Sequence, residues 1–199
     1  MLSKTTYRQN RIKQFICFIL LLSLARGLGA QGDDASPFGP TSISKGDIYA
    51  LIIGISDYED PKIEDLNFAH RDAEIFYDYL RSPAGGSVPK KNIKLLTETN
   101  ATISNIYVAK QWLEKNVGKE DLVYFYFSGH GDVESSSYKL GFLLAYDTPH
   151  KNYFNNAVRI EDFNIMANTL SERKDADVIM ITDACHSGKL GETNLTKVQ

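Results

Sequence analysis

Asp177–Gly188 reads DVIMITDACHSG and Leu122–Gly131 reads LVYFYFSGHG, and these two stretches decide the fold. Each is a nearly continuous apolar run that stops abruptly at small and polar residues, which is typical of a strand buried on both faces. Cys185 follows one run and His130 follows the other. Ligands of open parallel sheets bind outside the carboxyl ends of the strands. The pattern therefore predicts a thiol and an imidazole at one edge of a parallel sheet.

The rest of the chain alternates strand patterns with helix patterns, which predicts a three-layer α/β fold with a mostly parallel sheet. The apolar runs predict four strands, at Ile48–Ile55, Ile93–Thr97, Leu122–Ser128 and a last one that ends at Asp183. Apolar residues at helical spacing predict helices over Asn67–Leu80, from a Thr102 cap to Gly118, and over Arg159–Leu170. A short apolar segment at Gly141–Tyr146 predicts a small hairpin beside the site.

The chain has 199 residues, of which 43% are hydrophobic, and this length predicts one globular domain. Residues 1–30 have a basic, acid-free start, an apolar run and then small residues, which is the layout of a secretory signal peptide. Residues 31–47 lack periodicity and predict a linker, so the domain is expected over 48–199. We expect a secreted or periplasmic protein, with anchoring by an uncleaved N-terminal segment as the alternative, and no stable membrane span after cleavage.

Removal of residues 1–30 leaves 17 Lys and Arg against 25 Asp and Glu, a formal net charge of −8. A chain this acidic lacks the positive surface of a nucleic-acid-binding protein. Cys17 lies in the predicted signal peptide, so the mature domain keeps Cys185 as its one cysteine. A lone cysteine in an exported protein is a buried residue, an intermolecular bridge or a reactive thiol.

Cys185 and His130 fit a nucleophile and its general base. A cysteine attacks as thiolate, and the tetrahedral intermediate needs backbone N–H donors for its oxyanion. Gly129 and Gly131 are expected to let the chain turn tightly, and Gly131 can bring its N–H close to a substrate carbonyl. The alternative is a structural turn at SGHG beside a cysteine that acts as a small buried hydrophobe.

These motifs resemble those of the caspase-like cysteine peptidases, a group that includes caspases, metacaspases and bacterial relatives. The matching pieces are YALIIGI followed by a helix with Asp72-Ala73, then YFYFSGHG, then ITDACHSG. The resemblance implies a caspase-like fold with strand order 2-1-3-4. It also implies His130 as general base and acid, Cys185 as nucleophile, and the N–H groups of Gly131 and Cys185 as the oxyanion hole.

The resemblance also indicates specificity. Caspases carry Gln two places before the nucleophile, whereas this chain has Asp183 there, as metacaspases do. Asp72 and Ser128 fall where metacaspase-like enzymes line the same pocket. A carboxylate binds a guanidinium bidentately, so the expected substrate is a peptide or protein with Arg or Lys before the scissile bond. The alternative for each aspartate is an ordinary structural carboxylate.

No metal or other cofactor is expected, because the histidines are scattered and one thiol cannot build a zinc site. Some metacaspases bind calcium, which would here involve Asp132, Glu134 and Asp147. Loop carboxylates are more often simply solvated.

The chain departs from the caspase-like pattern after Gly188, where 11 residues remain and the small-subunit strands are missing. An open apolar fourth strand invites pairing with another chain. We therefore expect a fragment of a longer protein, an edge covered by a small-subunit portion or a second copy, or a non-peptidase remnant. The alternative to peptidase function is a catalytically silent interaction module, and a third possible function is that of an acyl transferase.

Overall fold

The computed structural model describes residues 46–134 and 138–184. The predicted signal peptide (1–30), most of the predicted linker and Cys185 lie outside these residues. Gly46 and Asp47, the last two linker residues, already belong to the domain. The Gly46 N–H donates to the Glu120 carbonyl at 3.1 Å, and the Asp47 N–H donates to the Asp121 carboxylate at 2.7 Å. In the described part of the chain, no helix is long and apolar enough to span a membrane.

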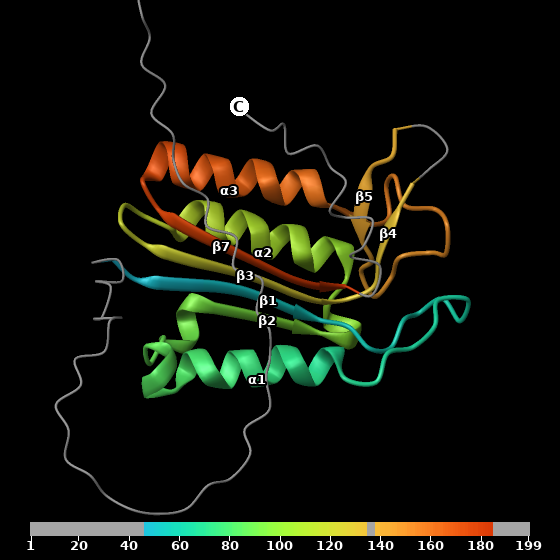
Figure 1. Cartoon of the computed structure of the whole chain (residues 1–199), viewed down its shortest axis with the longest axis horizontal. Helices are drawn as coiled ribbons and strands as arrows, with labels where there is room; N and C mark the ends of the chain where they lie inside the picture. The colour runs from blue at the N-terminus through green and yellow to red at the C-terminus, as the bar shows by residue number, and fades with distance from the viewer. Residues whose placement is uncertain (1–45, 135–137, 185–199) are drawn as a thin grey trace, which may run out of the picture. The chain divides into compact units, whose positions relative to one another are not determined.

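A four-stranded parallel sheet forms the centre of the domain (Figure 1), in the order β2-β1-β3-β7. Its strands are β1 (Ile48–Gly54), β2 (Ile93–Thr97), β3 (Leu122–Gly129) and β7 (Asp177–Ala184). Because β7 is the fourth strand of this sheet in chain order, the predicted order 2-1-3-4 is confirmed.

Helices cover both faces of the sheet, which confirms the three-layer prediction. α1 (Ala69–Arg81) lies on one face, and α2 (Ile103–Asn116) and α3 (Ile160–Lys174) lie on the other (Figure 1). The predicted cap of α2 is present, because the Thr102 hydroxyl accepts a hydrogen bond from the Asn105 N–H at 3.2 Å. Within the described residues, three short 3-10 helices occur in the connections, at Pro83–Gly85, Lys90–Asn92 and Glu98–Asn100.

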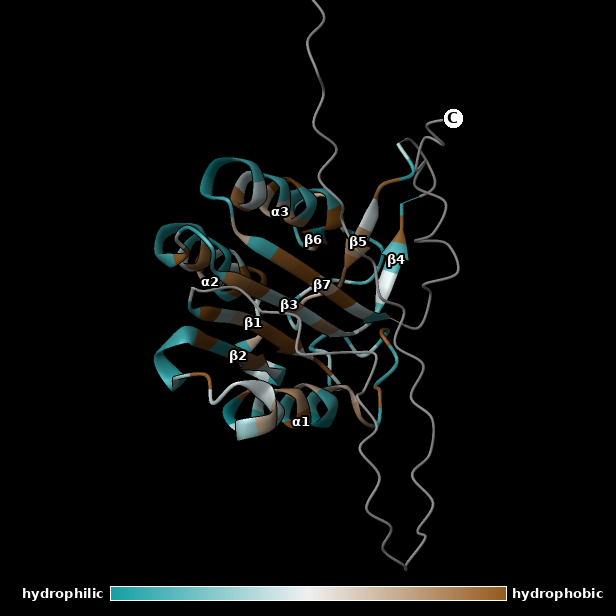
Figure 2. Ribbon diagram, turned by 60° about the vertical axis from the view of Figure 1, so that its left-hand side comes forward, coloured by the Kyte–Doolittle hydropathy of each residue, from teal (hydrophilic) through white to brown (hydrophobic). Residues whose placement is uncertain are grey.

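The larger core lies between the sheet and α2 and α3. Phe125 and Phe127 of β3 are fully buried there, and the Phe125 ring stacks on Phe163 of α3 at a centroid distance of 4.1 Å. On the opposite face, Tyr124 and Tyr126 are only partly buried, and Tyr126 stacks on Phe76 of α1 at 4.9 Å. Figure 2 shows largely hydrophobic strands between helices that mix hydrophilic and hydrophobic residues.

A small antiparallel sheet follows β3 directly, in the order β4-β5-β6. Its strands are β4 (Gly131–Val133), β5 (Gly141–Leu143) and β6 (Val158–Arg159). The expected hairpin at Gly141–Tyr146 is thus one strand of a three-stranded sheet, and the chain leaves it after Leu143. This sheet begins at the residue after His130, so it fixes where the histidine backbone lies.

β7 was expected to be covered on both faces, and the structure differs. β7 is at the edge of the described sheet, and the side chains of residues 178–181 are partly exposed. Val178 and Met180 pack against the core beneath α3. The face that carries Ile179 and Ile181 lies beside Tyr124 and Tyr126, in register on β3.

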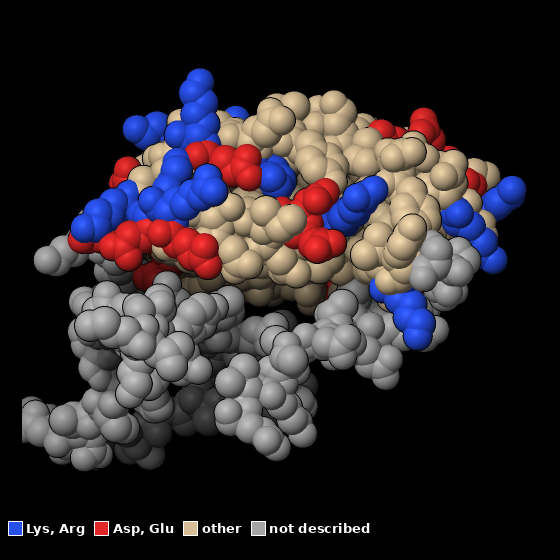
Figure 3. Space-filling view, turned by 90° about the horizontal axis from the view of Figure 1, so that it is seen from above, with Lys and Arg blue, Asp and Glu red and all other residues tan. Residues whose placement is uncertain are grey.

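Charged side chains of both signs alternate over the face seen in Figure 3. Lys110 and Glu114 of α2 form an ion pair at 2.7 Å, and Lys119 lies 3.9 Å from both Glu120 and Asp175. The described residues form no continuous basic surface on this face.

Candidate active site

The candidate site lies at the carboxyl ends of β3 and β7 (Figure 1). The two strands run in register to their ends, with Ser128 opposite Asp183 and Gly129 opposite Ala184. The next residues in the chain are His130 and Cys185. Adjacent strands lie about 4.8 Å apart. Each of the two predicted catalytic residues therefore comes directly after one member of a neighbouring backbone pair. Cys185 itself lies outside the described residues.

The His130 imidazole is held by a backbone carbonyl. Its Nε2 lies 2.6 Å from the Glu64 carbonyl oxygen, in the loop between β1 and α1. A carbonyl oxygen can only accept, so Nε2 carries a proton. In the neutral imidazole Nδ1 is then unprotonated, which is the state a general base requires. Sequence reasoning missed Glu64, because a contact through the backbone leaves no side-chain signature.

The Gly131 N–H is directed away from β5. In an antiparallel ladder, residue pairs alternate between hydrogen-bonded and non-hydrogen-bonded. The Leu144 N–H donates to the His130 carbonyl at 2.9 Å, and the Glu134 N–H donates to the Leu140 carbonyl at 2.9 Å. Gly131 lies opposite Leu143, between these bonded pairs. Within the described residues, the Gly131 N–H therefore makes no ladder bond to β5.

The expected tight turn at SGHG is not formed. Gly129 ends β3 and Gly131 begins β4, and neither has a positive φ. Among the described glycines, Gly86 alone has φ in the left-handed region, at 99°. Gly129 is needed for space: an added Cβ would lie 2.9 Å from the Tyr58 hydroxyl and 3.0 Å from the Phe127 ring.

The three predicted pocket residues lie on neighbouring elements of the same end of the sheet. Ser128 is in β3, Asp183 is beside it in β7, and Asp72 is in the first turn of α1. Burial raises the pKa of Asp72, the negative charge of Asp183 raises it further, and His70 acts in the opposite direction. The two carboxylates are therefore close enough to repel each other.

Tyr126 joins this group, and sequence reasoning missed it. Burial raises the pKa of Tyr126 to about 12, with further contributions from the charges of Asp72 and Asp183. A hydrogen bond with the Ser128 hydroxyl acts in the opposite direction. Alternation within a buried strand does not show which aromatic residue carries its hydroxyl to the end of the strand.

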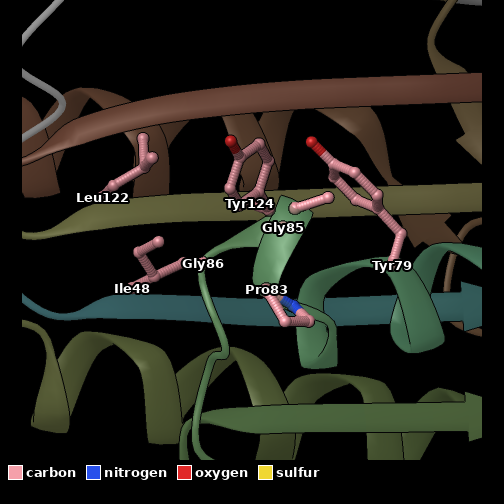
Figure 4. Close-up of a pocket in the computed structure, with 8 residues that line it drawn as sticks. Ile48, Tyr79, Pro83, Gly85, Gly86, Leu122 and Tyr124 are labelled. Carbon is pink, nitrogen blue, oxygen red and sulfur yellow. The ribbon is translucent and has the colours of Figure 1, made fainter. Parts of the chain in front are cut away.

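A cavity of about 200 Å³ adjoins His130 on the side of the small antiparallel sheet. It is bordered by His130, Gly131 and Asp132, by Ile63 and Glu64 of the loop after β1, and by Leu144, Tyr153, His150 and Lys62. A second cavity, of about 240 Å³, is shown in Figure 4 and is lined by Ile48, Leu122, Tyr79 and Tyr124 among others. Ile48 and Leu122 begin β1 and β3, so this cavity lies at the opposite end of the strands from His130.

The three carboxylates considered for calcium have separate protein partners. Asp132 accepts from the Tyr153 hydroxyl at 2.9 Å, and Asp147 accepts from the Ile103 N–H at 2.8 Å. Glu134 accepts from the Tyr138 N–H at 3.2 Å. The described residues contain no group of three His, Cys, Asp or Glu placed to hold a metal ion. Calcium binding stays a hypothesis.

The family model described as "Caspase domain" matches residues 48–199, which is most of the chain. The chain belongs to the caspase-domain family. The predicted resemblance is thereby confirmed at the level of the family, whose members are usually cysteine peptidases.

The fold of this caspase domain is also found among solved structures. It is similar to protein GSU0716 from Geobacter sulfurreducens, with a TM-score of 0.54 and 19% sequence identity. The match covers 70% of this chain and 51% of that one, so the chain corresponds to about half of that protein. At this identity the likeness shows the fold alone. A comparison with curated proteins gave no significant match.

Proposed function

We propose that this caspase domain is a cysteine endopeptidase that cleaves after Arg or Lys, with His130 and Cys185 as its dyad. The observation that carries the proposal is the register of β3 and β7, which pairs Gly129 with Ala184, the residues just before the histidine and the cysteine. Membership of the caspase-domain family supports it independently.

The described side of the dyad suits the reaction. Nδ1 of His130 takes the thiol proton, and the thiolate attacks the carbonyl carbon of the scissile bond. The Gly131 N–H donates to the resulting oxyanion, with the Cys185 N–H as the proposed second donor. The imidazolium then gives its proton to the leaving amine, and water, deprotonated by His130, hydrolyses the thioester. The Glu64 carbonyl, 2.6 Å from Nε2, stabilises the imidazolium that forms between these steps.

The acidic group at the same end of the sheet supports specificity for Arg or Lys. Burial raises the pKa of Asp72, and the negative charge of Asp183 raises it further in the free protein. A bound guanidinium or ammonium would offset the repulsion between the two carboxylates, because both negative charges attract it. Ser128 and Tyr126 add hydroxyl groups to the same wall.

We further propose that β7 pairs with a small-subunit portion or a second copy. In the described sheet, β7 pairs with β3 on one side, and its side chains are partly exposed. Size-exclusion chromatography with light scattering tests the second copy, since a monomer at micromolar concentration excludes it.

We also propose export of the chain, with residues 1–30 as a cleavable signal peptide. Sequencing of the N-terminus of the secreted protein tests this directly: a start near Gln31 supports cleavage. A full-length protein in the membrane fraction supports the alternative, an uncleaved anchor.

The peptidase proposal is tested with short peptide reporters that end in Arg, Lys or Asp, beside Cys185→Ala. Asp72→Asn tests the pocket, and Asp162→Asn on α3 is the matched control for loss of one carboxylate. We expect turnover of Arg and Lys reporters that vanishes in Cys185→Ala, falls in Asp72→Asn and persists in Asp162→Asn. Turnover after Asp overturns the specificity. Silence from a folded protein favours the interaction module, and transfer to an added amine in place of hydrolysis favours the acyl transferase.

A further inference from the structure

Tyr58 reaches the backbone of His130 from the loop that follows β1. Its hydroxyl oxygen accepts a hydrogen bond from the His130 N–H at 2.7 Å. The two rings also touch, with a centroid distance of 5.2 Å and an angle of 44° between their planes. Tyr58 is 7% exposed, so the contact is largely shielded from water.

This hydrogen bond completes the support of the histidine. The adjoining sheet uses the His130 carbonyl, which accepts from the Leu144 N–H at 2.9 Å. The His130 N–H donates a hydrogen bond to the Tyr58 hydroxyl oxygen, and the ring Nε2 donates to the Glu64 carbonyl. His130 is thus held at both backbone polar groups and at one ring nitrogen, which leaves Nδ1 for chemistry.

The absence of a side chain at Gly129 is independent evidence that this end of the sheet leaves space for the Tyr58 hydroxyl. A Cβ at position 129 would lie 2.9 Å from that oxygen, closer than real side chains approach. The backbone of Gly129 is in the extended strand and does not need glycine for its φ. The hydroxyl reaches the His130 N–H because position 129 has no side chain.

The loop that carries Tyr58 is itself held in place. The Tyr58 N–H donates to the Asp65 carboxylate at 3.3 Å. The N–H groups of Ser56 and Asp57 both donate to Glu98 Oε2, at 3.0 and 2.9 Å. Glu64, which holds the imidazole, belongs to the same loop, so one segment positions both the backbone and the ring of His130.

We propose that Tyr58 is a positioning residue for His130: its hydroxyl fixes the histidine backbone so that Nδ1 stays in place to accept the thiol proton. The inference rests on the proposed peptidase function and adds a residue that the caspase-domain motifs quoted above do not include. A displacement of about 1 Å in a catalytic group can cost about 100-fold in rate, which is why such support matters.

Tyr58→Phe tests the proposal, because it keeps the ring and removes the accepting oxygen. Tyr107→Phe is the matched control: its hydroxyl donates to Asp162 at 2.5 Å, between α2 and α3, and does not contact His130. We expect Tyr58→Phe to lower kcat for an Arg reporter about 10-fold or more with KM changed less than about twofold, because transition-state geometry is lost while binding is kept. Tyr107→Phe should leave both constants unchanged.

A second readout does not depend on activity. Nuclear magnetic resonance of ¹³C-histidine-labelled protein and amide hydrogen exchange should show a shifted His130 imidazole signal and faster exchange of its N–H in Tyr58→Phe. Gly129→Ala, whose methyl group displaces the hydroxyl, should give the same changes.

The outcomes separate the two claims. A fall in kcat together with the His130 changes supports the proposal. Unchanged kcat overturns it, as does a fall in kcat without any change at the His130 N–H. If the unsubstituted chain shows no turnover, the peptidase assignment fails by itself, and the His130 signals decide: a shift in Tyr58→Phe but not in Tyr107→Phe supports the positioning role, and identical spectra overturn it.

Discussion

Glu98→Ala removes the carboxylate that holds the loop after β1, and its cost can be worked out from the contacts. Oε2 of Glu98 accepts from the Ser56 and Asp57 N–H groups at 3.0 and 2.9 Å, and Oε1 lies 3.0 Å from Nδ1 of His70. A hydrogen bond to a charged group contributes about 1.5–3 kcal/mol. Two such bonds contribute at least about 3 kcal/mol to stability. Water reaches part of the 26% exposed side chain and lowers this contribution. We therefore expect a loss of about 2–4 kcal/mol in the free energy of unfolding.

Glu98→Gln is the matched control. Glu98 has a positive φ of 49°, and Gln and Ala share that constraint, so backbone strain cancels in the comparison. The Gln amide oxygen can replace Oε2 as acceptor, so this variant should lose only about 1 kcal/mol.

Urea unfolding measures the free energy of unfolding of both variants. A loss below about 0.5 kcal/mol in Glu98→Ala, or equal losses in the two variants, would refute the reasoning. Because the loop carries Tyr58 and Glu64, Glu98→Ala should also lower peptidase activity more than Glu98→Gln does.

Three further predictions follow from single contacts. The raised pKa of Asp72 means that the folded state binds its proton more tightly than the unfolded state, so the contribution of Asp72 to stability falls as pH rises through that raised pKa. At pH 7, Asp72→Asn should therefore equal the unsubstituted protein in stability or exceed it by less than about 1 kcal/mol. This difference should disappear below about pH 4, and a clear loss of stability at pH 7 contradicts the prediction. Thr102→Ala should cost about 1 kcal/mol in urea unfolding, and equal stability would rule out the cap. Peptidase activity should change less than about twofold when calcium is chelated, because Asp132 and Asp147 accept from protein donors; a loss that calcium restores would contradict this.

The strands were predictable because buried parallel strands need continuous apolar runs. Ile93–Thr97 was predicted to the residue, and the other strands to within one or two residues. The packing of α1 was less predictable. Its helical pattern contains several apolar positions, and the structure buries Ala69, Ala73 and Leu80 while Ile75 is 66% exposed. Sequence periodicity identifies the helix but does not show which of two apolar stripes faces the sheet.

The site was predictable where its residues sit in short motifs. Ser128 and Asp183 lie near the ends of two neighbouring strands, and His130 directly follows one of these strands, so their grouping comes from sheet topology. Tyr58 and Glu64 contact His130 from 72 and 66 positions away, one through a hydroxyl and the other through a backbone oxygen. Such contacts depend on the path of a loop, for which the sequence carries no periodic signal.

The most direct test of the central claim is covalent trapping of Cys185 by a peptide chloromethyl ketone with Arg next to the ketone, followed by mass spectrometry. The dyad and the acidic pocket predict one adduct, on Cys185, which is lost in His130→Ala, reduced in Asp72→Asn and weaker with an Asp reagent. No adduct on the folded protein, or one that forms equally well without His130, would contradict the dyad. An equal yield with the Arg and Asp reagents would contradict the pocket.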